Sequence, residues 1–282
     1  MIHMDKIIVG FDLSKGSRYA LDLAVDIANR WQHDVRLVYV HAQREEYNIK
    51  EDNSELRQRL DDITAGVQGR LRHSQIDYVV REGCVPVEVA NQAASDHASL
   101  IVVGSHGTSG FETSWIGKNT YRIIALATTP VLIVREDFNF NKALENIVLP
   151  IDSTATTRQK LPMAARFAQT FGSTIHVLGL YTSPSEAQRE AVTKYVGQCH
   201  QLLEKQGIDH NYSFVEVENN LTITTLEYAD KIKADMIVIM TEQESSISNL
   251  LLGSYAHQML HLSKIPVLSI QPEDVGRLRT GW

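Results

Sequence analysis

Three glycines in one loop have a spacing that could hold a phosphate group. They are Gly104, Gly107 and Gly117, within the stretch VVGSHGTSGFETSWIGKNTYR at residues 102–122. Glycine adopts positive φ and has no Cβ, so a phosphate could approach the backbone N–H groups closely. A helix that begins near Gly117 would add free N–H donors and the positive end of its dipole. The alternative is structural, with two glycines that form a turn and a third that only precedes a helix.

Polar residues beside these glycines leave two interpretations each. The Lys118 ammonium could contact phosphate oxygens as a point charge, or its long side chain could point into solvent. Asn119 could donate to a phosphate or cap the following helix. His106 could contact a phosphate or act as an acid or base, or it could be exposed and idle.

A second stretch of similar layout, VIMTEQESSISNLLLGSYAHQ at residues 238–258, keeps only the third glycine as Gly253. Met240 and Gln243 stand where the first two glycines would be, and their Cβ atoms would crowd a phosphate and restrict φ. Two nearby glutamates would repel phosphate charge. The second loop is therefore a poorer place for a phosphate than the first, where both interpretations stay open.

The two loops belong to two halves of the chain whose sequences repeat each other. DKIIVGFDLSKGSRYALDLAVDIANRWQHDVRLVYVHA, from residue 5, aligns without a gap with ENIVLPIDSTATTRQKLPMAARFAQTFGSTIHVLGLYT, from residue 145. Later segments align at an offset of 136, which puts Gly117 over Gly253. Apolar and turn positions agree throughout. The sequence thus predicts two copies of one domain, over residues 1–137 and 145–282.

Each copy alternates segments typical of strands and of helices. Short apolar runs such as IIVGFD (7–12) and SLIVVG (99–104) predict strands, and Ser14 or Ser17 could cap the helix after the first run. Strict alternation predicts an α/β fold, with helices on both faces of a doubly wound parallel sheet. Such sheets bind ligands outside the carboxyl ends of their strands, where the strand order reverses. The glycine loop and Asp12 both follow strands at that edge.

Composition limits the classes of protein and partner. The chain has 282 residues, 43% hydrophobic and 22% charged, which is enough for two globular domains. A net charge of −7 offers no basic field for nucleic acid. No apolar run approaches the ~20 residues of a membrane helix, and the N-terminal residues do not read as a signal peptide. We expect a cytoplasmic protein with neither a nucleic acid nor a membrane as partner.

The IIVGFD start, the repeated α/β order and the G-x2-G-x9-G spacing resemble the universal stress protein family. The resemblance covers nearly the whole chain as two tandem copies and implies an adenine nucleotide α-hydrolase-like fold. It implies that the glycine loop holds ATP, with Mg, and that Asp12 and Val40 line the adenosine pocket. In ATP-binding members a Ser or Thr follows the third glycine, so Lys118 departs from the signature. It also implies that Val131 to Val134 pair with Val267 to Ile270 in an intramolecular pseudo-dimer, with a homodimer left open.

The leading hypothesis is a stress-response regulator that binds an adenine nucleotide in domain 1 and none in domain 2, with a protein partner that the sequence does not name. The candidate nucleotide-binding residues are Asp12, Val40, Gly104, Gly107, Gly117, Lys118 and Asn119. The alternative is an interaction scaffold of the same fold without a nucleotide. A third, weaker reading is a nucleotide-using enzyme, which suffers because the chain has no Walker A sequence. The sequence shows no pattern typical of catalysis, such as a Ser-His-Asp order, a metal cluster or a carboxylate pair. We therefore expect slow ATP hydrolysis at most.

Overall fold

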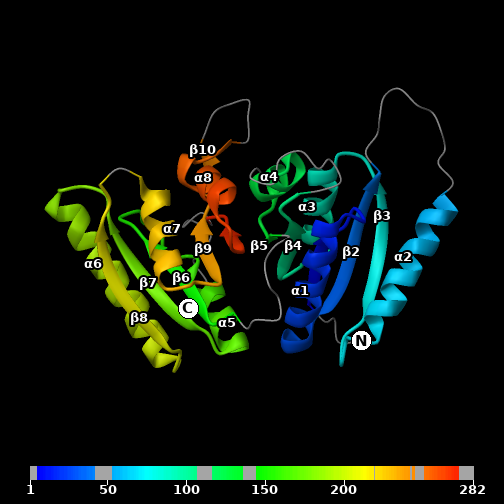
Figure 1. The fold of residues 1–282 in the computed structure, drawn as a ribbon, viewed down its shortest axis with the longest axis horizontal. Coiled ribbons are helices and arrows are strands. Elements are labelled where there is room, and N and C mark those ends of the chain that lie inside the picture. Colours follow the sequence, from blue (N-terminus) through cyan, green and yellow to red (C-terminus); the bar gives the residue numbers. More distant parts are fainter. Residues whose placement is uncertain are drawn as a thin grey trace. The chain divides into compact units, whose positions relative to one another are not determined.

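The structure, a computed structural model, forms two compact units, residues 1–137 (domain 1) and 138–282 (domain 2). Figure 1 labels their elements in chain order. The described residues are 5–41, 53–106, 116–135, 144–218, 220–241, 243–244 and 251–272.

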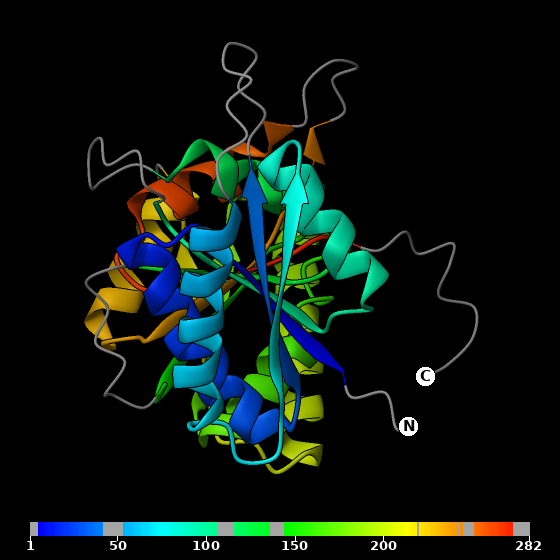
Figure 2. The same ribbon diagram turned by 90° about the vertical axis from the view of Figure 1, so that its right-hand side faces the viewer.

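Domain 1 is an α/β domain with a parallel sheet in the order β3-β2-β1-β4-β5. Figure 2 shows α1 and α2 on one face of β2 and β3, and α3 on the other face. The described elements are β1 (Lys6–Gly10), α1 (Lys15–Trp31), β2 (Asp34–His41), α2 (Asn53–Gln68), β3 (Ile76–Glu82), α3 (Val85–Ser95), β4 (Leu100–Gly104), α4 (Lys118–Leu126) and β5 (Val131–Val134).

Domain 2 repeats this arrangement, with parallel strands in the order β12-β9-β6-β7-β8. Domain 2 also contains a short antiparallel pair, β10 with β11. The described elements are β6 (Asn146–Ile151), α5 (Leu161–Phe171), β7 (Thr174–Tyr181), α6 (Glu186–Lys205), β8 (His210–Glu216), α7 (Leu221–Lys231), β9 (Met236–Met240), β10 (Gln243–Glu244), β11 (Leu251–Leu252), α8 (Ser254–Leu262) and β12 (Val267–Ile270).

Local sequence explains where these elements begin and what they bury. Ser14 caps α1, because its Oγ accepts the backbone N–H of Ser17 at 3.1 Å. Of the two serines considered for this role, the structure selects the first. β4 is buried along its whole length, as expected for a central strand covered on both faces. Among the described residues, no helix is long and apolar enough to cross a membrane.

The two copies differ at the start of one helix, which the alignment did not predict. The helix α5 begins at Leu161, whereas α1 begins six residues earlier in the aligned numbering, at Lys15. Pro162 at the start of α5 explains this, because a proline lacks the N–H that a longer helix would need there. The aligned counterparts of β10 and of Leu251 in domain 1, within residues 107–115, lie outside the described residues. The pairing of the last strands of the two domains stays a prediction.

Candidate functional site

The strand order of domain 1 reverses between β1 and β4, and their carboxyl ends flank this switch point. The N–H of Phe11 donates to the carbonyl of Val38 at 3.0 Å, which extends the β1–β2 ladder by one residue. Asp12 follows one residue later, at the same edge of the sheet as the carboxyl ends of β2 and β4. Val40 is the penultimate residue of β2, and Gly104 is the last residue of β4. Three of the candidate residues thus meet at the edge where doubly wound sheets bind ligands.

The Asp12 carboxylate also shapes the turn that leads into α1. Its Oδ1 accepts the backbone N–H of Ser14 at 3.0 Å. Between these two residues, Leu13 has a φ of 66°, a left-handed conformation that costs a leucine energy. Asp12 is half-buried. Its place in this turn accounts for an aspartate here whether or not a ligand is bound, so its role in binding stays a prediction.

Gly104 packs against the first turn of α1. A Cβ built on Gly104 would lie 2.7 Å from the carbonyl carbon and 2.9 Å from the carbonyl oxygen of Gly16. Neither Gly104 nor Gly117 has a positive φ. The expectation that these glycines supply unusual backbone conformations is therefore wrong for both. At Gly104 the missing Cβ lets a helix and a strand approach each other.

Gly117 precedes α4 and ties the start of that helix to the end of β4. Its N–H donates to the carbonyl of Ser105 at 2.8 Å. The Thr120 hydroxyl donates to the Gly104 carbonyl at 2.9 Å. These bonds bring Gly104, Gly117 and the N-terminus of α4 together, whereas Gly107 lies outside the described residues.

Lys118 and Asn119 are the first two residues of α4, and both are exposed. Gly117 occupies the N-cap position, so the alternative in which Asn119 caps the helix is wrong. His106 is half-buried, with its Nδ1 3.0 Å from the Ser105 hydroxyl oxygen, and is therefore not idle in solvent. Lys118 thus adds a positive charge to the first turn of α4, and the N-terminus of a helix itself favours an anion.

The same edge of domain 2 is built differently. Met240, at the place of Gly104, ends β9 and is only 8% exposed. Thr156, at the place of Gly16, belongs to a non-helical turn before α5. In domain 2 the larger side chain of Met240 therefore occurs together with a helix, α5, that lacks the first turn of α1. Gln243, which aligns with Gly107, is the first residue of the strand β10.

Two polar groups near this edge of domain 2 are also engaged. The Asp152 Oδ1, aligned with that of Asp12, accepts both the N–H and the hydroxyl of Thr154, at 2.8 and 2.6 Å. Tyr255, aligned with the exposed Asn119, has its pKa raised by burial and further by the charge of Asp152. The half-buried Tyr255, whose hydroxyl lies 3.5 Å from the Thr225 hydroxyl, thus stands where domain 1 presents the exposed Asn119.

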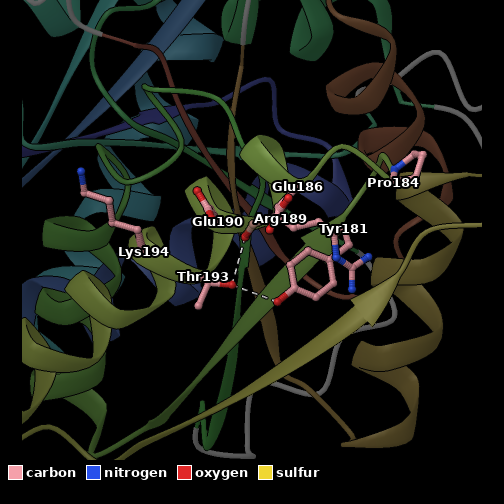
Figure 3. A pocket seen from close by; sticks show the side chains of 7 residues that line it. All are labelled: Tyr181, Pro184, Glu186, Arg189, Glu190, Thr193 and Lys194. Atoms are coloured by element: carbon pink, nitrogen blue, oxygen red, sulfur yellow. Dashed lines mark hydrogen bonds between the residues drawn. The ribbon is translucent and has the colours of Figure 1, made fainter.

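A pocket of about 500 Å³ lies where β7 ends and α6 begins (Figure 3). The Arg189 guanidinium lies 4.1 Å from the centre of the Tyr181 ring, and the Tyr181 hydroxyl is 3.0 Å from the Thr193 hydroxyl. These three side chains thus contact one another. Sequence reasoning missed this pocket, because no motif marks it. It is lined by Tyr181, Pro184, Glu186, Arg189, Glu190, Thr193 and Lys194.

Two histidines of domain 2 lie close together, as the first two ligands of a metal ion would. His257 and His261 lie on one face of α8, with ring centres 4.4 Å apart. Over the ranges that the structure describes, no group of three or more His, Cys, Asp or Glu side chains could hold a metal ion. The histidine pair thus gains no third ligand there.

The sequence profile of the universal stress protein family matches residues 3–135 and 143–271. The chain belongs to the universal stress protein family. Two successive matches make it a tandem member, as the internal repeat predicted. The chain is 29% identical over 146 residues to the universal stress protein YxiE of Bacillus subtilis, a match that covers 46% of this chain and 99% of YxiE.

A second relative is the universal stress protein Rv2623 of Mycobacterium tuberculosis, 33% identical over 140 residues. This match covers 46% of the present chain and 45% of Rv2623, so it spans about half the length of that relative. Matches of this length support the family, and the activity and partners of the whole relative do not follow from them.

Solved structures match over nearly the whole chain. A universal stress protein from Archaeoglobus fulgidus DSM 4304 has a TM-score of 0.75 at 15% identity, covering 96% of this chain and 97% of that one. A putative universal stress protein from Pseudomonas aeruginosa has a TM-score of 0.72 at 17% identity, covering 95% and 94%. At these identities the likeness shows the fold alone, and it confirms the predicted fold class.

Proposed function

We propose that domain 1 binds an adenine nucleotide, ATP with Mg, and that domain 2 does not. The observation that carries the proposal is the convergence of Asp12, Gly104 and the N-terminus of α4 at the switch point, beside the exposed Lys118. In domain 2 the corresponding edge has the buried Met240 and the half-buried Tyr255 instead. An adenine nucleotide is what the family resemblance implies for the first of these edges.

Each candidate residue has a proposed role. Asp12 and Val40, from neighbouring strand ends, line the adenosine pocket. Gly107 and Gly117 leave room for the phosphates, which accept hydrogen bonds from the first N–H groups of α4. Lys118 neutralises phosphate charge in place of the hydroxyl that other ATP-binding members have. Asn119 donates through its amide, and Gly104 keeps β4 packed on α1.

A nucleotide in domain 1 would make the protein a stress-response regulator. Binding shifts a conformational equilibrium by the difference in affinity between two states, and a protein partner could then distinguish those states. The proposal assigns domain 2 a structural or regulatory part. Because no candidate residue is a clear general base or nucleophile, at most slow ATP hydrolysis accompanies binding.

Lys118→Met tests the phosphate end of the site. Lys118 is exposed, so the substitution should leave the fold intact. Loss of one charge-assisted contact should weaken MgATP binding about tenfold, measured by calorimetric titration. Lys264→Met, which removes an exposed lysine of domain 2, is the matched control and should bind as the unmodified protein does. Equal affinity in the two variants would contradict the role of Lys118.

A further inference from the structure

β8 is the outermost strand of the domain 2 sheet, and it carries exposed aromatic side chains. Tyr212 is 54% exposed and Phe214 is 37% exposed. The outermost strand of domain 1, β3, has instead a half-buried Tyr78, whose hydroxyl donates to Asp61 at 2.9 Å. An exposed edge strand with large apolar side chains is a template for pairing with another strand.

The free hydrogen-bonding groups of β8 follow from its register with β7. The N–H of Ile175 donates to the carbonyl of Asp209, and the N–H of Val217 donates to the carbonyl of Tyr181, both at 2.9 Å. Odd-numbered residues of β8 therefore bond to β7, and even-numbered residues direct N–H and C=O groups to the outer edge. Among the described residues, no backbone hydrogen bond is made to the outward N–H and C=O groups of this outer row. It consists of His210, Tyr212, Phe214 and Glu216.

The side chains of this outer row share one face and are held in place. The Phe214 ring is stacked on Tyr181, with ring centres 5.4 Å apart and planes 7° apart. It lies over Gly179, where a Cβ would come within 2.5 Å of the ring. Tyr212 lies edge-on to Phe214, at 6.1 Å. Because these rings are already ordered, a partner would lose little side-chain entropy on docking.

We propose that a second copy of this chain pairs antiparallel with β8 about a two-fold axis at Ser213. In this register Tyr212 faces Phe214 of the second copy, and His210 faces Glu216 of the second copy. Each contact occurs twice, because the interface is symmetric. Outward-directed residues face outward-directed residues, so both rows of backbone groups are satisfied. The proposal is independent of nucleotide binding.

Neighbouring registers are less favourable. An axis at Tyr212 sets His210 against Phe214, and an axis at Phe214 sets Tyr212 against Glu216. Both lose the pairing of an acidic side chain with one that can carry positive charge. Within its own chain Glu216 already accepts Arg189, and His210 contacts His200. Of these three registers, an axis at Ser213 is the one that sets Glu216 against a histidine and the two aromatic side chains against each other.

A disulfide at the axis tests the register. Ser213→Cys, in the full chain with the exposed Cys84→Ser, should form an intermolecular disulfide on mild oxidation. Residues facing each other in a non-hydrogen-bonded antiparallel pair have Cα atoms about 4.5 Å apart, within disulfide reach. Asn211→Cys is the matched control, because it lies on the same face of β8 but faces Val215 of the second copy. It should remain monomeric in non-reducing gels, and equal cross-linking of both variants would overturn the register.

Sedimentation equilibrium tests the interface itself. The unmodified chain should sediment at twice the monomer mass. Tyr212→Lys, at an exposed position, should give the monomer mass with an unchanged circular dichroism spectrum. A monomeric unmodified chain, or a dimer that persists in Tyr212→Lys, would overturn the proposal.

Discussion

At the scale of single residues, Gly104 illustrates how one residue can have a predicted role and an observed one. Its spacing from the other two glycines predicts a phosphate loop, and that spacing is what a sequence displays. Its contact with Gly16 depends on how closely α1 packs on β4, and no local pattern reveals that distance. Substitution of this glycine therefore tests packing before it tests ligand binding.

Gly104→Ala should destabilise domain 1 by about 1–3 kcal/mol, because the new methyl group must displace the backbone of Gly16. The measurement is urea unfolding of the full chain, followed through the transition of domain 1. Gly66→Ala in α2 is the control, since no atom lies within 4 Å of its Cβ position. It should stabilise the same domain by about 0.5–1 kcal/mol. Equal effects of both substitutions would refute the packing argument.

The burial of His176 should make the stability of domain 2 depend on pH. Burial lowers its pKa, while in the unfolded chain a histidine titrates near pH 6.5. Below about pH 6.5 the unfolded chain therefore binds more protons, and the free energy of unfolding falls as the pH drops. Urea midpoints at pH 7.5 and 5.5 should differ less in His176→Gln than in the unmodified chain. The same difference in both proteins would exclude His176 as a cause.

At the scale of elements, helix caps give a direct stability prediction. The Ser14 hydroxyl accepts the N–H of Ser17, whereas Ser185, at the N-cap position of α6, makes no side-chain capping bond. Ser14→Ala should therefore cost about 1 kcal/mol of stability in urea unfolding, and Ser185→Ala should cost much less. Similar losses in both variants would contradict this view of α1.

The positions of most helices and strands could be predicted from the sequence, because the spacing of apolar residues and the alignment of the two copies indicate the same elements. The aligned helices α4 and α8 even begin and end at an offset of 136, as the glycine alignment requires. The late start of α5 was missed, although Pro162 was a readable signal for it. The β10–β11 pair could not be predicted, because two-residue strands have no alternation to detect.

At the scale of the whole molecule, the sequence predicts which edge of each sheet could bind a ligand. Alternating strands and helices require a doubly wound sheet, and this puts Asp12, Val40 and Gly104 at one edge. The exposed aromatics of β8 were not predicted, because their exposure depends on β8 being the outermost strand. Strand order is set by long-range packing, so a single strand sequence does not contain it.

The central claim is that one domain of the two binds a nucleotide. The most direct measurement is a calorimetric titration of the purified, nucleotide-stripped full chain with MgATP, read for stoichiometry. The account predicts about one site per chain, lost in Gly107→Gln, which introduces the residue that domain 2 has at the aligned position. Two sites per chain would contradict the claim that domain 2 binds no nucleotide. No heat and no thermal shift would contradict nucleotide binding and favour the interaction scaffold.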